Sequence, residues 1–281
     1  MASSRSRILL GLLGSPIGHS ATPAMHEAAG DEIGIRVLYQ LIDVPGADAA
    51  ALQALLAGAQ RFGFAGLNVT FPYKQAIVPL LDRVAPGVAA INAVNTVVLR
   101  DGALVGHNTD MTGLQAALQE GLGTVTGAVA LIGAGGMGRA AAYALQGLGC
   151  QVRVFDTDAA RARDLADAVG GAVCATAAEA LDGAAGVVNG TPLGMLPNRE
   201  CPIDPALLHE GLWVFDAVYF PLVTPLLAAA RRRGCRTVDG GALARHQARD
   251  AFYLFTGQRA PNGVMSAAFA AHLAGRTSDA A

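Results

Sequence analysis

Apolar runs and helix-like segments alternate along the whole chain. Short runs rich in Leu, Ile and Val predict buried strands, and longer Ala-rich segments predict helices. The first part of the chain gives strands over 7–14, 36–44 and 66–71, alternating with helices over 22–34 and 47–63. This order favours parallel pairing of the strands. Residues 92–108 predict a hairpin that turns at Asp101-Gly102.

A second series of strands and helices begins near residue 125. Strands are predicted over 129–133, 151–158, 186–192 and 212–220, and helices over 134–149, 159–170 and 224–235. Residues 242–274 predict one or two further helices after a complete strand–helix unit, and we expect them to pack on the first part of the chain.

The predicted fold class is α/β with two domains, since 281 residues exceed a typical single domain. Residues 1–112, completed by the C-terminal helices 241–281, are expected to form an N-terminal α/β domain, and residues 113–240 a second one. Charged residues make up 15% of the chain, against roughly 25% in average globular proteins. With 35 glycines, this composition suits tightly packed layers of helix on sheet.

Charge and cysteine usage argue against several classes of function. A net charge of −2 leaves no basic surplus for nucleic acid. The four cysteines form no CxxC pair and the six histidines no HExxH motif, so we expect no metal and a reducing, cytoplasmic setting. The run ILLGLLG is short and no cleavage pattern follows it, which favours a first strand over a signal peptide. No run approaches the about 18 apolar residues of a membrane span, so no membrane partner is expected.

A glycine-rich turn opens the first helix of the second series. Gly133, Gly135 and Gly138 have the G-x-G-x-x-G spacing of a Rossmann-type dinucleotide-binding domain, between a predicted strand and a predicted helix. The first glycine allows a tight turn, the second lets a pyrophosphate approach the backbone, and the third permits close packing. The residues between them complete the expected cofactor contacts: Ala134, Gly136 and Met137. The alternative is a packing turn without a ligand.

Asp156, at the end of the next predicted strand, bears on which dinucleotide binds. A carboxylate there can accept hydrogen bonds from the adenosine ribose hydroxyls and repels a 2′-phosphate, which favours NAD over NADP. Arg161 and Arg163 lie one helical turn further on. Arg161 is kept as a possible cofactor contact, while the alternative for both is a solvated charge on a helix.

Lys74 is the only lysine among 20 basic residues. A lysine can exchange a proton with a substrate hydroxyl, whereas an arginine stays protonated in proteins. The single lysine is therefore a candidate general base, and the alternative is an ordinary surface lysine. Asp110, expected just before a helix, could orient the ammonium group, or it could be a helix N-cap.

Small hydroxyl and amide side chains accompany this pair and suit a compact ligand with several hydroxyls. They are Ser20, Thr22, Asn68, Thr70, Asn95 and Gln247.

With these residues the chain resembles the shikimate dehydrogenase family, including its quinate/shikimate dehydrogenase branch. The matching motifs run along nearly the whole chain: GSPIGHSATPAMH (14–26), GLNVTFPYK (66–74), NAVNT (92–96), GHNTD (106–110), GAGGMG (133–138), NGTPLGM (189–195), DAVYFPLVTPLL (216–227) and HQARDAFYLFTG (246–257).

The resemblance implies a role for each matching position. Lys74 and Asp110 would be the catalytic pair. The substrate carboxylate would be held by Ser20 and Thr22, with Tyr219 nearby, and the ring hydroxyls by Asn68, Thr70, Asn95 and Gln247. The nicotinamide side would be lined by Thr191, Pro192 and Met195, and Gly241 is a further expected cofactor contact.

Two departures from the common family pattern favour the branch that uses NAD. Thr22 stands where serine is common, and the branch resembles this chain in having threonine there. The string Asp156-Thr157-Asp158 stands where NADP-dependent members often carry Asn-Arg-Thr.

The resemblance thus implies a reversible, NAD-linked oxidation of the C3 hydroxyl of shikimate, quinate or both. One alternative is an NADP-linked biosynthetic shikimate dehydrogenase. An alternative of another class is a non-catalytic, dinucleotide-sensing regulator, against which the Lys74–Asp110 pair speaks. The expected partner is a small-molecule substrate, and either a monomer or a homodimer is compatible with the sequence.

Overall fold

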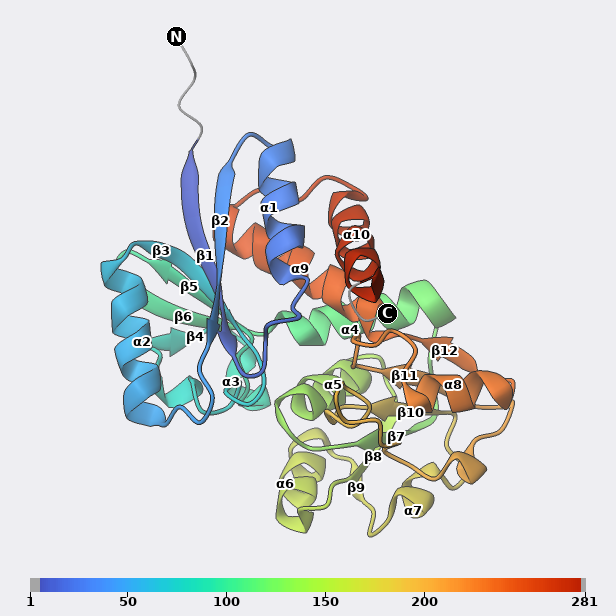
Figure 1. Ribbon diagram of the computed structural model, residues 1–281. Helices are drawn as coiled ribbons and strands as arrows, with labels where there is room; N and C mark the ends of the chain where they lie inside the picture. Colours follow the sequence, from blue (N-terminus) through green and yellow to red (C-terminus); the bar gives the residue numbers. More distant parts are fainter. Residues whose placement is uncertain (1–5, 279–281) are drawn as a thin grey trace. The chain divides into compact units, whose positions relative to one another are not determined.

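The computed structural model describes residues 6–278 and divides into two compact units (Figure 1). One unit runs to Thr109 and takes in the chain again from Gln247 onward, and the other is Asp110–His246. The boundaries expected from the sequence, after residues 112 and 240, stay a prediction; the two units divide the chain after residues 109 and 246. The first five and last three residues of the expected N-terminal domain lie outside the described residues.

The first unit is built on a six-stranded mixed sheet in the order β2-β1-β3-β5-β6-β4. Its strands are β1 (Arg7–Gly14), β2 (Arg36–Asp43), β3 (Phe64–Val69), β4 (Arg83–Val84), β5 (Thr96–Arg100) and β6 (Ala103–His107). The expected parallel pairing is confirmed for β1 with β2 and with β3. The expected hairpin is β5–β6, and its turn residues Asp101 and Gly102 both have positive φ, as the favoured two-residue turn requires.

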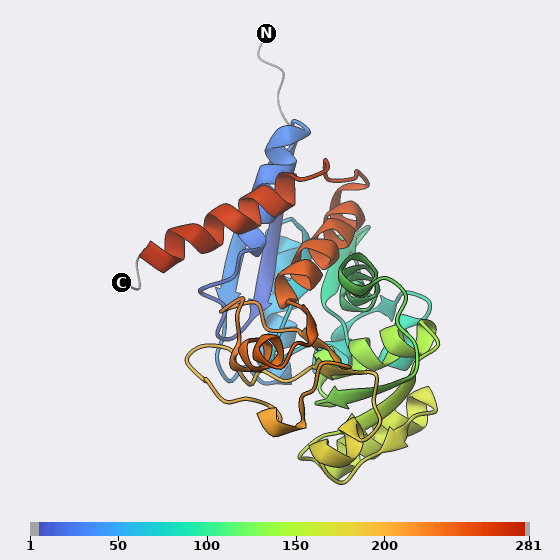
Figure 2. The same ribbon diagram turned by 90° about the vertical axis from the view of Figure 1, so that its right-hand side faces the viewer.

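Helices cover both faces of this sheet (Figure 1). On one face lie α1 (Thr22–Glu32) and α10 (Val264–Ser278), which pack together, and Figure 2 views the unit from that side. On the other face lies α2 (Ala49–Arg61). Short helical turns are η1 (Val78–Leu80) and α3 (Val88–Ile91). The C-terminal stretch forms two helices, α9 (Gly240–Thr256) and α10.

The second unit contains a six-stranded, fully parallel sheet in the order β12-β11-β10-β7-β8-β9. The strands are β7 (Ala128–Ile132), β8 (Gln151–Phe155), β9 (Ala172–Val173), β10 (Gly186–Asn189), β11 (Trp213–Asp216) and β12 (Arg236–Val238). Helix α4 (Thr109–Leu122) precedes β7, and the connections between the strands contain α5 (Gly136–Gly147), α6 (Ala159–Val169), α7 (Ala177–Leu181), η2 (Pro205–Leu207) and α8 (Pro225–Arg232). This is the doubly wound order, and it confirms the expected Rossmann-type fold.

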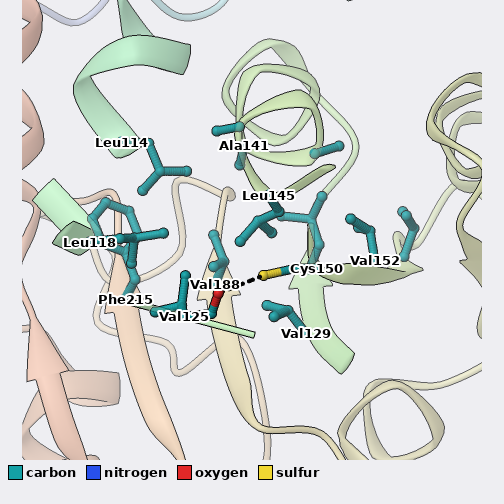
Figure 3. Packing of buried hydrophobic residues seen from close by; sticks show 14 of the residues in the cluster. Leu114, Leu118, Val125, Val129, Ala141, Leu145, Cys150, Val152, Val188 and Phe215 are labelled. Carbon is teal, nitrogen blue, oxygen red and sulfur yellow. Dashed lines mark hydrogen bonds between the residues drawn. The ribbon is translucent and has the colours of Figure 1, made fainter. Parts of the chain in front are cut away.

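Apolar side chains fill the space between this sheet and its helices. Figure 3 shows Leu114 and Leu118 of α4 and Leu145 of α5 packed over Val129 and Phe215 of the strands. Among the described residues all four cysteines are free, and burial raises the pKa of the Cys150 thiol, which points at the Val125 carbonyl. No helix within residues 6–278 combines the length and apolar character needed to cross a bilayer.

Two strands are shorter than the sequence predicts. The expected strand over 212–220 ends at Asp216, and the expected strand over 186–192 ends at Asn189. In both cases a buried polar side chain terminates the strand and bonds to the loop that follows. Apolar residues continue beyond Asp216, which is why the pattern predicts a longer strand there, whereas Gly190, Thr191 and Pro192 after Asn189 already belong to the loop.

His26 of α1 lies fully buried inside the first unit. Its ring centroid is 5.1 Å from that of Tyr39, 5.8 Å from Phe252 and 5.9 Å from Phe255. Neither ring nitrogen has a hydrogen-bond partner among the described residues. Burial lowers the pKa of His26 to about 3, because no group compensates the loss of water around an imidazolium.

This histidine should make the fold sensitive to acid. In the unfolded chain its pKa is about 6.5, so between that value and about 3 the unfolded state binds the extra proton. The free energy of unfolding is therefore highest, as far as His26 is concerned, above pH 6.5. It falls as the pH falls below that value, by about 2 kcal/mol at pH 5. We predict that His26→Leu reduces the drop in unfolding free energy between pH 7.5 and 5, measured by urea denaturation. The control is His209→Gln at an exposed histidine, and an unchanged acid dependence in His26→Leu would contradict the assignment.

Candidate active site

The glycine-rich turn of the second unit joins β7 to α5, and its three glycines are required for different reasons. Gly133 has φ of 99°, a conformation that side chains rarely adopt. A Cβ on Gly138 would lie 1.9 Å from the Gly133 carbonyl oxygen, so this glycine permits the close packing. A Cβ on Gly135 would meet nothing within 4 Å, which leaves open space beside the N-terminus of α5. Open space beside backbone N–H groups at a helix N-terminus fits a pyrophosphate.

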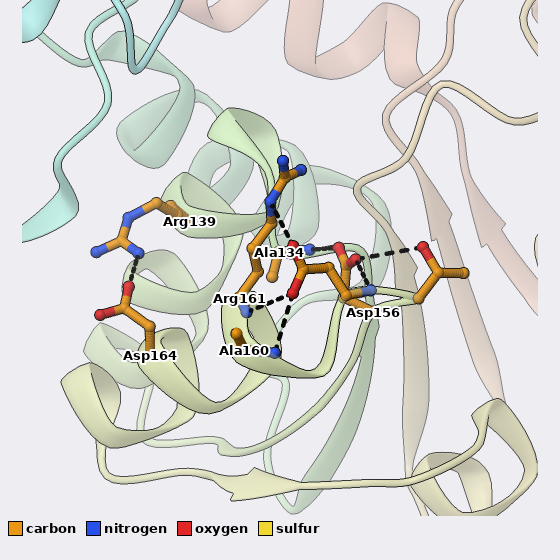
Figure 4. A network of polar contacts seen from close by, with 8 residues as sticks. Ala134, Arg139, Asp156, Ala160, Arg161 and Asp164 are labelled. Carbon is orange, nitrogen blue, oxygen red and sulfur yellow. Dashed lines mark hydrogen bonds and ion pairs between the residues drawn. The ribbon is translucent and has the colours of Figure 1, made fainter.

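Asp156 follows β8 directly and ties its end to this turn (Figure 4). One carboxylate oxygen accepts a 2.6 Å hydrogen bond from the Ala134 N–H, and the other accepts a 2.8 Å bond from the Asp158 N–H. A carboxylate offers about four acceptor sites, so Asp156 keeps capacity for ribose hydroxyls. The same side chain therefore shapes the turn and presents negative charge beside it.

Arg161 is paired within its own helix. Asp158 caps α6 by accepting from the Ala160 and Arg161 N–H groups, and its second oxygen lies 3.2 Å from the Arg161 Nε. Figure 4 shows a second ion pair, in which the buried Arg139 donates a 2.6 Å bond to Asp164. The Arg161 side chain is 64% exposed, which fits the alternative that this arginine is a solvated charge on the helix surface.

The loops after β10 and β11 are held by buried polar residues. Asn189 accepts from the Thr191 N–H at 3.0 Å and from its hydroxyl at 2.7 Å, and the Met195 N–H bonds to the Pro192 carbonyl at 3.1 Å. Asn189 also donates to Asp216 at 2.9 Å. Burial raises the pKa of Asp216 to about 6, while its hydrogen bonds to Thr224, Val218 and Asn189 oppose the shift.

The expected cofactor residues, apart from Arg161 within α6, and the expected substrate residue Tyr219 follow the carboxyl ends of parallel strands. The glycine-rich turn follows β7, Asp156 follows β8, Thr191 to Met195 follow β10, and Tyr219 follows β11. Gly241 lies in the first turn of α9 after β12, where its N–H bonds to Asp239 at 2.9 Å. Ligands of doubly wound sheets bind at this edge, near the point where the strand order reverses, here between β7 and β10.

In the first unit, amide side chains form a continuous buried chain of hydrogen bonds. Asn68, next to last in β3, accepts from the Tyr39 hydroxyl at 2.7 Å and donates to the Thr96 hydroxyl at 3.0 Å. The Asn95 amide nitrogen donates to the Thr109 hydroxyl at 2.9 Å, and it also donates to the Gln247 side-chain oxygen, with a nitrogen–oxygen distance of 3.5 Å. Three of the expected substrate residues, Asn68, Asn95 and Gln247, are thus brought together.

The remaining polar candidates of this unit lie at the start of α1 and after β3. The Ser20 hydroxyl donates to that of Thr22 at 3.0 Å, and the Thr22 N–H donates back to Ser20 at 3.2 Å. Both residues are buried. Thr70 follows β3 and bonds through its N–H to the Leu13 carbonyl at 2.9 Å, which fixes it at the carboxyl end of β1.

Lys74 is anchored by its backbone beside the amide chain. Its carbonyl accepts a 2.8 Å bond from the Val94 N–H, so Lys74 neighbours Asn95. The Thr109 N–H donates to the Asn95 side chain at 2.7 Å, and Asp110 follows Thr109. The lysine side chain is half-buried, and Asp110 is 4% exposed. The segment 94–95 therefore anchors both Lys74 and the residue that precedes Asp110.

The position of Asp110 in its helix differs from the expectation. Helix α4 begins at Thr109, so Asp110 lies inside the first turn and not before the helix, and the N-cap alternative is wrong. A carboxylate in the first turn is favoured by the helix dipole. The helix thus starts two residues earlier than the sequence suggests, and the N–H of its first residue, Thr109, donates to the Asn95 side chain.

Sequence reasoning missed Tyr39, Asn189 and Asp216, which hold the predicted residues in place. A signal for two of them is present: Asn189 and Asp216 each end an otherwise apolar strand, GVVN and WVFD. A polar residue at the end of a fully buried strand needs a partner. No cluster of three or more metal-binding side chains occurs within residues 6–278.

Comparison with known proteins gives two family matches and many relatives. Residues 12–97 match the shikimate dehydrogenase substrate-binding domain, and residues 128–199 match a family described as coenzyme F420-dependent NADP oxidoreductase. A quinate/shikimate dehydrogenase (NAD(+)) of Corynebacterium efficiens is 49% identical over 89% of this chain and 93% of its own. A shikimate dehydrogenase (NADP(+)) of Streptomyces avermitilis is 45% identical over 95% and 96%.

A solved structure resembles this chain over nearly its whole length. The quinate dehydrogenase of Corynebacterium glutamicum in complex with NAD has 43% sequence identity and a TM-score of 0.84, covering 95% of this chain and 99% of that one.

The surroundings of Gly135 and Gly138 predict different effects of an alanine substitution at the two positions. Gly135→Ala should leave the melting temperature within about 2 °C of wild type, since its Cβ meets only open space, yet weaken dinucleotide binding at least about tenfold by filling the pyrophosphate position. Gly138→Ala should lower the melting temperature by several degrees, because its Cβ would overlap the Gly133 carbonyl. Thermal denaturation and calorimetric titration with NAD and NADP measure the two effects. Equal behaviour of the two variants would contradict the assignment.

Proposed function

Since the chain belongs to the shikimate dehydrogenase family, we propose that it catalyses the reversible, NAD-dependent oxidation of the C3 hydroxyl of shikimate, quinate or both to the 3-dehydro ketone. The observation that carries this proposal is the anchoring of Lys74, the only lysine of the chain, beside the buried chain of amides around Asn95. Such a place suits proton exchange with the hydroxyl of a small polyol.

Neutral side chains would bind the substrate. The hydroxyls of Ser20 and Thr22 would donate to its carboxylate, assisted by Tyr219, and each can rotate its hydrogen toward the ligand. The ring hydroxyls would be bound by Asn68, Thr70, Asn95 and Gln247. An amide both donates and accepts, so it matches a hydroxyl group, which does the same. The hydrogen bonds among these amides would hold their orientation when the substrate enters.

Lys74 would accept the proton of the C3 hydroxyl as the C3 hydrogen leaves with its electron pair. In the reverse direction the lysine would return that proton to the oxygen of the ketone. Asp110 would orient the amine, since its carboxylate accepts hydrogen bonds and its backbone is fixed through Thr109. Asn95 would then position both members of the pair. Its backbone adjoins Val94, whose N–H binds the Lys74 carbonyl, and its side chain binds Thr109, the residue before Asp110.

The second unit would bind the dinucleotide, which supplies the hydride acceptor when bound. The N-terminus of α5, with Gly133 to Gly138, would hold the pyrophosphate, and Asp156 would accept from the adenosine ribose hydroxyls. Thr191, Pro192 and Met195 would line the nicotinamide side, with Gly241 as a further contact. Arg161 would lie at the adenosine end, where Asp158 already pairs with it.

NADP is the alternative cofactor, as the name of the Streptomyces avermitilis relative indicates for that enzyme. Asp156 argues against it here, because a 2′-phosphate would face a carboxylate and an arginine that is already paired. A regulator that senses the dinucleotide without turnover remains the alternative of another class, and a wild-type assay separates it from an enzyme. The proposed setting is the cytoplasm, as a monomer or a homodimer.

Exchange of the lysine tests the base. Lys74→Ala and Lys74→Arg should each lower kcat by about 10²- to 10⁴-fold, because neither side chain can accept the proton, while NAD affinity changes less than about twofold. Steady-state kinetics with shikimate and quinate and titration with NAD measure this. Arg100→Lys, at an exposed arginine, is the control for the exchange of one cation for the other. A Lys74→Arg enzyme of near wild-type rate would contradict the proposed role.

Removing one charge tests the cofactor preference. Asp156→Asn keeps an oxygen that can accept from the Ala134 N–H but loses the negative charge. The ratio of kcat/KM for NAD to that for NADP should exceed 10 in wild type and fall at least about tenfold in the variant, which corresponds to ~1.4 kcal/mol. Asp164→Asn, which also removes a paired carboxylate of this unit, is the control and should keep the wild-type ratio. An unchanged ratio in Asp156→Asn would assign the preference to other residues.

A further inference from the structure

Asn189 and Asp216 are neighbours at the carboxyl edge of the second unit's sheet. They are the last residues of β10 and β11, they are register partners in the parallel pair, and both are completely buried. The other residues of these two strands are glycine or apolar. Two adjacent polar side chains in such surroundings must satisfy each other and the loops that follow.

Asp216 collects three donors from three different segments. Its Oδ1 accepts from the Asn189 amide at 2.9 Å and from the Val218 N–H at 3.0 Å. Its Oδ2 accepts from the Thr224 hydroxyl at 2.6 Å, and Thr224 in turn caps α8 by accepting from the Leu227 N–H at 3.2 Å. Both ends of the loop 217–224 are thus bound to one carboxylate.

Asn189 extends this hold to the loop after β10. It accepts from both the N–H and the hydroxyl of Thr191, and its amide donates to the Leu193 carbonyl at 3.2 Å as well as to Asp216. Thr191 lies against the glycine-rich turn, since a Cβ on Gly133 would meet the Thr191 methyl at 2.7 Å. Asp216 therefore controls, through Asn189, where Thr191 lies relative to that turn.

We propose that Asp216 is a positioning residue for the nicotinamide end of the cofactor: its carboxylate fixes the loops of Thr191 and Tyr219, so that its loss impairs hydride transfer without affecting the adenosine end. This inference rests on the proposed function, which places Thr191, Pro192 and Met195 beside the nicotinamide. Asp216 itself would touch neither the cofactor nor the substrate, because it is fully buried beneath the loops.

The cost of burying this carboxylate supports a role beyond folding. Its pKa is raised from 3.8 to about 6, so its contribution to stability is present below pH 3.8 and is lost as pH rises through 6. At neutral pH the buried charge thus disfavours the folded state, and it adds to burial, the larger cause, in raising the pKa of the Cys201 thiol. An asparagine would avoid the charge but has one acceptor oxygen, so it could not accept from all three donors.

Two variants test the inference with separate readouts for the two ends of the cofactor. Thr224→Val removes the hydroxyl held by Asp216 at nearly constant volume, and Asp216→Asn removes the charged acceptor. For each we measure kcat and kcat/KM for NAD with saturating shikimate, and the inhibition constant of ADP-ribose, which lacks nicotinamide. We expect kcat/KM for NAD to fall about 10- to 100-fold, with a loss in kcat. The inhibition constant of ADP-ribose should stay within about twofold of the wild-type value.

Two further variants separate positioning from general destabilisation. Thr224→Ser keeps the hydroxyl and should restore kcat/KM to within about threefold of wild type. Thr176→Val removes the cap of α7, where the hydroxyl accepts from the Glu179 N–H at 3.1 Å, and should leave kcat/KM for NAD unchanged although it also loses a helix cap.

The possible outcomes distinguish this inference from the proposed function. A parallel loss of ADP-ribose and NAD recognition in Thr224→Val would overturn the inference, because it would show a general loss of the unit's structure. Full activity of Thr224→Val and Asp216→Asn would overturn it as well. A wild-type protein that turns over neither shikimate nor quinate would refute the proposed function, and the inference with it.

Discussion

The parallel register of the second unit's sheet is the constraint on which its binding edge depends. Because β7, β8, β10 and β11 run in one direction, their carboxyl ends meet at the same edge. The glycine-rich turn, Asp156, Thr191 and Tyr219 are far apart in the sequence but share that edge. An antiparallel neighbour would present the opposite end of its strand here, so no equivalent set of loops could form around one ligand.

Carboxylates hold the loops and helix ends at this edge through hydrogen bonds within the protein. Asp156 binds the N–H of Ala134, Asp158 caps α6, and Asp216 binds both ends of the loop 217–224. Each satisfies backbone donors that would otherwise be left unpaired at a strand or helix end. We propose that the charge of Asp156 also bears on the choice of cofactor, because a second phosphate on the adenosine ribose would lie beside this carboxylate. In the proposed function, Asp156 would thus both stabilise the turn and disfavour NADP.

The first unit solves a different problem with neutral groups. Asn68, Asn95 and Gln247 come from two strands' ends and a C-terminal helix, and hydrogen bonds to Tyr39, Thr96 and Thr109 fix their orientation. Buried amides need such partners, since an unpaired one would cost free energy. These fixed amide groups suit a polyol as ligand, because hydroxyl groups, like amides, both donate and accept hydrogen bonds. Lys74, whose backbone is bound next to Asn95, adds a group able to exchange a proton.

The sequence by itself determined the features that depend on neighbouring residues. Apolar runs and turn residues identified most strands and helices, the glycine spacing and Asp156 identified the dinucleotide unit, and the single lysine identified the candidate base. Only the tertiary structure decided where β10 and β11 end, that α4 begins at Thr109, and that Asp216 binds Thr224. The short strands β4, β9 and β12 also appear only there, because two or three residues carry no periodicity. The physical reason is range: hydrophobic pattern is a local property, whereas the partner of a buried polar atom is set by strand register between segments distant in the chain.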